Sequence, residues 1–193
     1  MEFTSICAMI AFILSLIAYV PYFYLILKNR TRPSLSSWIS WCAVDLVLLV
    51  GMLSAGTIAW QLVAYVIGCL SIIGAMFFTK TFEIVWSRVD TACLFMVVLA
   101  ILFWVLSGDL HATIVFSLLA VTVGSVPTYI KLWKNPDSEP LSSWALTWSG
   151  GVFGMFAIQT WDIVSALTPV WFFCLQSFVC LLILRRTFSL KIH

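Results

Sequence analysis

Long apolar stretches separated by short polar segments dominate the hydrophobic pattern of the chain. Seven of these stretches approach or exceed the roughly 20 residues that an α-helix needs to cross a bilayer. They cover residues 3–27, 36–55, 57–79, 91–107, 110–133, 141–160 and 163–184. The pattern predicts an all-α integral membrane protein with seven transmembrane helices, joined by loops too short to hold a soluble domain.

The composition supports a membrane protein over a soluble one. Apolar residues make up 63% of the 193 residues, charged residues only 9%, and the mean hydropathy is +1.10. Soluble domains carry roughly one quarter charged residues. We therefore expect the lipid bilayer and a small-molecule solute to be the partners of this chain, and no nucleic acid. The sequence leaves the oligomeric state open, and a homo-oligomer is one of the options.

The basic residues all fall on one side of the predicted topology. Each of the ten follows the first, third, fifth or seventh predicted helix: Lys28, Arg30, Arg32, Lys80, Arg88, Lys131, Lys134, Arg185, Arg186 and Lys191. Cytoplasmic loops of membrane proteins are enriched in Lys and Arg. We therefore expect a cytoplasmic C-terminus and an N-terminus on the outer or lumenal side.

One segment occurs twice in the chain. Residues 20–41 read VPYFYLILKNRTRPSLSSWISW, and residues 126–148 read VPTYIKLWKNPDSEPLSSWALTW. An ungapped alignment gives seven identities within 18 residues, which indicates an internal duplication. It predicts two parallel three-helix repeats, residues 1–89 and 109–193, joined by a linker helix in residues 90–108. Parallel repeats are a transporter architecture with a solute site between the halves, although duplication can also serve only to build a sturdy bundle.

Each copy of the repeated segment carries a proline and, fifteen residues later, a serine that follows a leucine. The spacing runs from Pro21 to Ser36 and from Pro127 to Ser142. It resembles the PQ-loop motif of the PQ-loop and SWEET transporter superfamily, although the residue after each proline is not the family's glutamine. The resemblance implies a solute carrier with three helices, a linker helix and three more helices, and with its N-terminus outside.

A second pattern, Trp38-x-x-Trp41-x-x-x-Asp45, is similar to one in the vitamin carriers for nicotinamide riboside. Asp45 is the one acid deep within a predicted helix, where an unpaired carboxylate is costly. It either takes up a proton together with the solute or binds a polar group of the solute. A protonated acid bonded to a backbone carbonyl is the structural alternative. Trp41 lies one helical turn earlier on the same face and is a second candidate for solute binding.

The family resemblance also implies solute-binding residues near the midplane of the third and seventh predicted helices, where family members use tryptophan and a carboxamide. Trp171 and Gln176 are the candidates in the seventh helix, and Ser71 lies beside the matching position in the third. Gln176 could instead bridge two helices. In the sixth helix, Trp148 could offer a flat face to a sugar or a heteroaromatic ring, or could face lipid.

The two prolines of the repeat, Pro21 and Pro127, lie in the cytoplasmic thirds of the first and fifth predicted helices. Each removes a backbone hydrogen bond and favours a kink. Paired kinks fit the hinges of a cytoplasmic gate, as the resemblance also implies, and a static kink is the alternative. Trp38 and Trp144, at the start of the following helices, are expected in an aromatic belt at the membrane interface.

The sequence indicates neither catalytic nor metal chemistry. The six cysteines lie in apolar stretches without a C-x-x-C pair, and the chain has only two histidines. We therefore expect no disulfide, metal site or cofactor. The predicted helices hold no Ser/His pair or two-acid site, so an enzyme is not expected. The sequence predicts a carrier of a small polar solute (a sugar, an amino acid or a vitamin) by alternating access. The alternative is a seven-span receptor that binds a ligand without carrying it.

Overall fold

The structure, a computed structural model, describes residues 2–31, 33, 35–54, 56, 58–82 and 88–189. These residues form helices joined by short turns. The helices are α1 (Phe3–Ile17), α2 (Tyr19–Leu27), α3 (Leu35–Ser54), α4 (Trp60–Thr79), α5 (Arg88–Ser107), α6 (Leu110–Lys134), the 3-10 helix η1 (Pro136–Ser138), α7 (Leu141–Phe156) and α8 (Ile163–Ser189). The prediction of an all-α protein is therefore confirmed.

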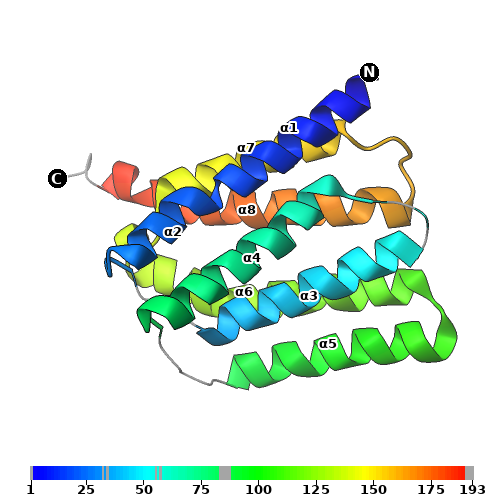
Figure 1. Cartoon of the computed structure of the whole chain (residues 1–193), viewed down its shortest axis with the longest axis horizontal. Helices are drawn as coiled ribbons and strands as arrows, with labels where there is room; N and C mark the ends of the chain where they lie inside the picture. Colours follow the sequence, from blue (N-terminus) through cyan, green and yellow to red (C-terminus); the bar gives the residue numbers. More distant parts are fainter. Residues whose placement is uncertain are drawn as a thin grey trace.

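The helices lie side by side in one bundle, and α1 and α2 follow each other along a single rod (Figure 1). We call α1–α4 the N-terminal group and α6–α8 the C-terminal group. In the N-terminal group α4 packs against α1, α2 and α3, and in the C-terminal group α8 packs against α6 and α7. The groups meet where α1 packs against α7 and α3 packs against α6, and α5 packs against both α3 and α6. The last helix of each group thus lies between the other rods of that group.

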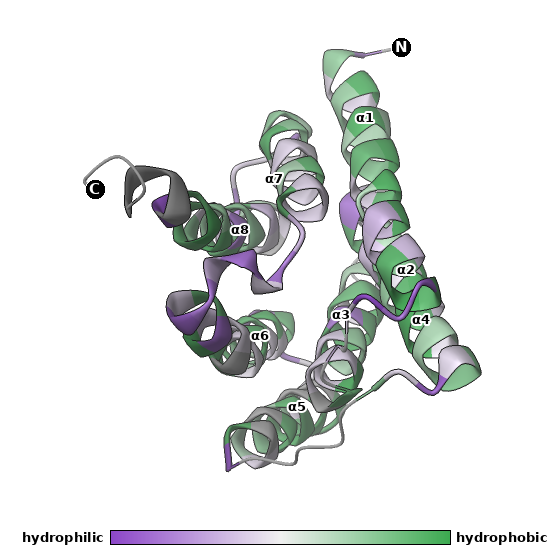
Figure 2. Ribbon diagram, turned by 90° about the vertical axis from the view of Figure 1, so that its left-hand side faces the viewer, coloured by the Kyte–Doolittle hydropathy of each residue, from purple (hydrophilic) through white to green (hydrophobic). Residues whose placement is uncertain are grey.

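Among the described residues, five helical stretches are long and apolar enough to cross a membrane. They are Phe3–Leu27, Ser37–Ser54, Trp60–Thr79, Leu110–Lys134 and Ser165–Arg185. Figure 2 shows that hydrophobic residues make up much of the length of the helices. Many large apolar side chains are exposed; Phe78, for example, is 86% exposed and Leu106 80% exposed. A broad apolar exterior is typical of a surface that contacts a membrane.

Neither of the other two predicted membrane helices, α5 and α7, supplies an apolar stretch of that length among the described residues. The apolar part of α5 covers Leu94–Ser107. Helix α7 ends at Phe156 after 16 residues, whereas the apolar stretch in the sequence continues to residue 160. Asp162 then caps the start of α8, where it accepts hydrogen bonds from the Thr160 hydroxyl and the Ser165 amide. Five helical stretches thus have the length and composition of a membrane span, and the total of seven spans stays a prediction.

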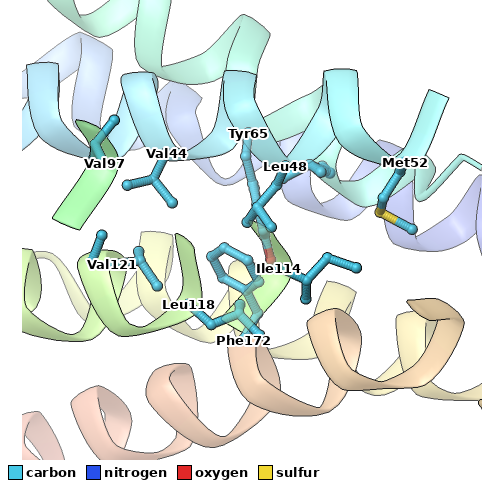
Figure 3. Packing of buried hydrophobic residues seen from close by; sticks show 11 residues of the cluster. Val44, Leu48, Met52, Tyr65, Val97, Ile114, Leu118, Val121 and Phe172 are labelled. Atoms are coloured by element: carbon cyan, nitrogen blue, oxygen red, sulfur yellow. The ribbon is translucent and has the colours of Figure 1, made fainter. Parts of the chain in front are cut away.

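An apolar core lies between the two groups (Figure 3). Val44 and Leu48 of α3 face Leu118 and Val121 of α6, and Phe172 of α8 completes the contact. A second core lies within the N-terminal group and a third within the C-terminal group. Because lipid tails are as apolar as these side chains, close packing rather than burial from water holds such helices together.

The two copies of the repeated segment both join helices at the same end of the bundle, opposite the N-terminus (Figure 1). The first copy connects α2 to α3, and the second connects α6 to α7 through η1. The helix of the first copy is interrupted between Ile17 and Tyr19. Pro21 lacks the N–H that would bond to the carbonyl of Ile17, which accounts for the interruption. In the second copy α6 continues through position 127, and the side chain of Pro127 lies outside the described residues.

Candidate functional site

A cavity of about 110 Å³ lies between the two groups, and α2, α3, α4, α6, α7 and α8 all contribute to its lining. We call it the central cavity. It extends from mid-bundle, at Tyr65 and Gln176, toward the end that carries the basic residues, at Ser143. Eight aromatic side chains form much of its wall: Tyr19, Tyr22, Trp38, Trp41, Tyr65, Tyr129, Trp144 and Phe172.

Trp38 lies in the middle of this aromatic wall. Its ring centroid is 5.2 Å from that of Tyr22, 5.5 Å from that of Trp41 and 6.2 Å from that of Tyr19. Only 7% of Trp38 is exposed, so it is not the interface residue that the sequence suggested. The start of α3 is covered by α2 and α4, which turns the indole toward the cavity instead of toward lipid.

Asp45 of α3 is the one Asp, Glu, Lys, Arg or His among the described residues that line the central cavity. It is 3% exposed, its Oδ2 accepts a weak hydrogen bond from the Cys69 thiol at 3.9 Å, and its Oδ1 has no partner. The two ion pairs of the described residues lie elsewhere, at Lys131 with Glu139 and at His111 with Asp109. The carboxyl group is therefore buried without a basic partner.

Gln176 of α8 reaches across the cavity to the N-terminal group. Its Nε2 donates a hydrogen bond to the hydroxyl of Tyr65 on α4, and its Oε1 has no partner. The adjacent position on α7 is Gly151, where an added Cβ would lie 2.7 Å from the Gln176 Oε1. The glycine therefore makes room for the amide group at this depth.

Several buried polar atoms in the central cavity lack a hydrogen-bond partner. They are the Trp41 Nε1, the Asp45 Oδ1, the Tyr129 hydroxyl, the Ser143 Oγ and the Gln176 Oε1. Buried polar atoms in folded proteins are nearly always hydrogen-bonded, and each exception requires an explanation. Because the unpaired atoms come from α3, α6, α7 and α8 and belong to residues that line one cavity, the arrangement suits a polar ligand that both donates and accepts hydrogen bonds.

Glu139, in the turn before α7, joins three elements at the basic end of the cavity. Its carboxylate accepts hydrogen bonds from the Lys131 Nζ at 2.9 Å and from the Trp144 Nε1 at 3.4 Å. Tyr22 of the N-terminal group lies close to the same carboxylate. Sequence reasoning missed this residue, although an acid directly ahead of an apolar helix start, where the first copy of the repeat has Pro33, was a visible signal.

A second cavity, of about 680 Å³, lies toward the N-terminal end of the bundle and is lined by residues such as Phe12, Trp60, Gln61 and Pro169. We call it the outer cavity. Close helix packing separates it from the central cavity. A Cβ at Gly154 of α7 would lie 2.5 Å from the Gln61 Oε1, and one at Gly150 would lie 3.2 Å from a backbone oxygen of α1. The barrier between the two cavities therefore depends on the small face of α7.

The structure brings three of the predicted solute-binding residues together and leaves three apart. Asp45, Trp41 and Gln176 all line the central cavity. The side chains of the other three lie outside the central cavity and donate hydrogen bonds to nearby groups. The Trp171 Nε1 donates to the Thr122 hydroxyl at 2.9 Å, the Trp148 Nε1 to the Ser177 hydroxyl at 2.8 Å and the Ser71 hydroxyl to the Ile67 carbonyl at 2.7 Å. The face of α4 that points inward carries Tyr65 and Cys69 instead.

The described residues contain no group of three or more His, Cys, Asp or Glu side chains that could hold a metal ion. Comparison with protein-family models, with curated proteins and with solved structures finds no match. The function has to be argued from the geometry of the cavity itself.

Proposed function

We propose that this chain is a membrane carrier that moves a small polar solute by alternating access between its N-terminal and C-terminal groups. The observation that supports this function best is the central cavity. It lies between the groups, both groups contribute to its wall, and it holds buried polar atoms without partners. A second cavity on the far side of a thin barrier of close-packed helices supports a route through the bundle.

The proposed carrier has seven spans arranged as two parallel repeats. The rod of α1 and α2, together with α3 and α4, forms the first repeat; α5 is the linker; and α6, α7 and α8 form the second repeat. The position of the last helix between the other rods of each group supports this division. The basic residues at the ends of α2, α4, α6 and α8 support a cytoplasmic C-terminus and an N-terminus on the outer side.

In this proposal Asp45, Trp41 and Gln176 bind the solute. Asp45 also couples transport to protons, because a buried carboxyl group without a basic partner can bind a proton in one step of the cycle and release it in another. Pro21 and Pro127 serve as hinges of the gate at the basic end. Ser71, Trp148 and Trp171 lie outside the central cavity and have no part in the proposed site.

The proposal is tested by uptake of labelled solutes into vesicles that contain the purified full-length protein. The panel comprises a hexose, a neutral amino acid, nicotinamide riboside and choline, each with and without an imposed pH gradient. We expect time-dependent uptake of at least one solute above that of protein-free vesicles. A solute that binds saturably to the protein in detergent and yet is not taken up would identify a receptor instead.

A further inference from the structure

The charge balance of the central cavity limits the kind of solute that it can bind. Among the described residues no Lys, Arg or His side chain lines it, and Asp45 is the one carboxyl group in its wall. The nearest other acid, Glu139, is already paired with Lys131 at 2.9 Å. A solute that carries a negative charge would therefore meet a buried carboxyl group and no basic side chain to compensate its charge, which disfavours anionic solutes.

The aromatic wall favours a positive charge for an independent reason. Tyr19, Tyr22, Trp38 and Trp41 lie in one contiguous cluster, with neighbouring ring centroids 5.2 to 6.2 Å apart. The faces of aromatic rings carry partial negative charge and attract organic cations, most strongly where water is excluded. Trp144 and Tyr65 extend this wall into the C-terminal side and the middle of the cavity.

The same wall is unsuited to an inorganic cation. Hard metal ions take six or more oxygen ligands in close geometry. The oxygen atoms without partners on residues that line the central cavity include only one carboxylate oxygen, from Asp45, and they are spread over α3, α6, α7 and α8. An ammonium group with carbon substituents needs one carboxylate and several ring faces, and the cavity supplies both.

We infer that the solute of the central cavity is a small organic cation, whose ammonium or other cationic group lies against Asp45 within the aromatic wall. The inference rests on the proposed function, because it names the class of solute for the same site. The unpaired Gln176 Oε1 and Ser143 Oγ are then available to a hydroxyl or amide group on the rest of the solute. The cation and a proton would compete for Asp45, so the two roles proposed for that residue are compatible.

A matched pair of probes tests the inference. Choline and its neutral isostere 3,3-dimethylbutan-1-ol have the same shape and differ in one formal charge. Binding of each to the purified full-length protein is measured by titration of the intrinsic tryptophan fluorescence. We expect saturable choline binding that is at least about tenfold tighter than binding of the neutral alcohol. Equal binding of the two probes would contradict the inference, as would no choline binding to a protein that melts cooperatively.

Two variants locate the charge effect. Asp45→Asn keeps the shape of the side chain, and we expect it to weaken choline binding at least about tenfold while leaving the neutral alcohol unchanged. Ser71→Ala alters a hydroxyl outside the cavity and serves as the control, with both affinities unchanged. Unchanged choline binding in Asp45→Asn would contradict the inference. Displacement of choline by an equal concentration of Na⁺ would assign the site to an inorganic cation and overturn it.

The outcomes also separate this inference from the proposed function. Choline that binds through Asp45 but is not carried into vesicles would support the cation site and contradict the carrier. Uptake of a neutral solute by a protein that does not bind choline would support the carrier and contradict the cation site. If the Asp45→Asn variant does not fold, the comparison of choline with its neutral isostere in the wild-type protein still decides the inference.

Discussion

Gln176 of α8 donates a hydrogen bond to the hydroxyl of Tyr65 of α4, a residue 111 positions earlier in the sequence. The bond joins the C-terminal group to the N-terminal group. Tyr65 lines the central cavity, and Gln61, one helical turn before it on α4, lines the outer cavity. The hydrogen bond therefore lies in the barrier between the two cavities.

Breaking this bond should destabilise the protein. Tyr65→Phe leaves the buried Gln176 amide without a partner, and Gln176→Leu leaves the Tyr65 hydroxyl without one. We expect each single variant to lower the free energy of unfolding by about 1–3 kcal/mol. The double variant should lose less than the sum of the two, because the residues interact directly. Thermal unfolding of the purified protein measures this, and strictly additive losses would argue against a direct bond.

Two glycines of α4 provide a matched test of the cavity wall. A Cβ at Gly68 would overlap the ring of Tyr19, whereas a Cβ at Gly74 would meet nothing within 4 Å. We expect Gly68→Ala to displace the Tyr19 ring, lower the stability by about 1–3 kcal/mol and weaken choline binding. Gly74→Ala should leave binding unchanged and stabilise the helix by up to about 1 kcal/mol. Thermal melts and fluorescence titrations of the two variants are compared, and similar behaviour of both would contradict the close contact at Gly68.

The ion pair between Lys131 and Glu139 lies at the basic end of the cavity. Removing the acid and removing the base should lower the stability of the protein by different amounts. The Lys131 side chain is 42% exposed, but that of Glu139 only 6%. Glu139→Gln should therefore lower the free energy of unfolding by about 1 kcal/mol or less, since water screens the exposed lysine. Lys131→Met should cost more, because it leaves a buried carboxylate without its basic partner. Lys134→Met, at an exposed position one turn later, is the control.

Adding Glu139→Gln to Lys131→Met should restore part of the stability that Lys131→Met loses. Thermal unfolding of the single and double variants shows the order of their stabilities. A Lys131→Met variant as stable as the Lys134→Met control would show that the pair contributes nothing to stability.

The interruption between α1 and α2 allows a test of the hinge. Pro21→Ala restores a backbone N–H that can bond to the Ile17 carbonyl, so we expect one continuous helix. A hinge that can no longer bend should slow uptake into vesicles while leaving solute affinity unchanged. The ratio of uptake rate to affinity is compared with that of the wild-type protein and of Pro127→Ala. Full transport in both proline variants would contradict the hinge.

The sequence could predict the helical class, the apolar character of the helices and three residues of the central cavity. Asp45 stood out because a carboxyl group within an apolar helix is costly wherever it lies. Trp41 followed from its helical spacing to Asp45, and Gln176 from the site position that the family resemblance implies. The signals at Asp45 and Trp41 are local, and the helix period carries them directly from sequence to structure.

Which of the remaining residues face the central cavity depends on how each helix is rotated about its axis. In a soluble protein the polar face of a helix reveals that rotation, but both faces of a helix in lipid are apolar. The sequence therefore led to Ser71, and only the structure shows that Tyr65 lines the central cavity while Ser71 lies outside it. Glu139 reaches Trp144 and Lys131 through the turn of the second repeat, a contact that no local pattern indicates.

The most direct test of the carrier is solute uptake into vesicles driven by a proton gradient, compared between the wild-type protein and Asp45→Asn. We expect the wild-type protein to accumulate a solute of the panel faster when the gradient is imposed. The Asp45→Asn variant, folded as judged by a cooperative thermal melt, should show no response to the gradient. Equal gradient-driven uptake by the two proteins would contradict the role of Asp45, and saturable binding without any uptake by the wild-type protein would contradict the carrier itself.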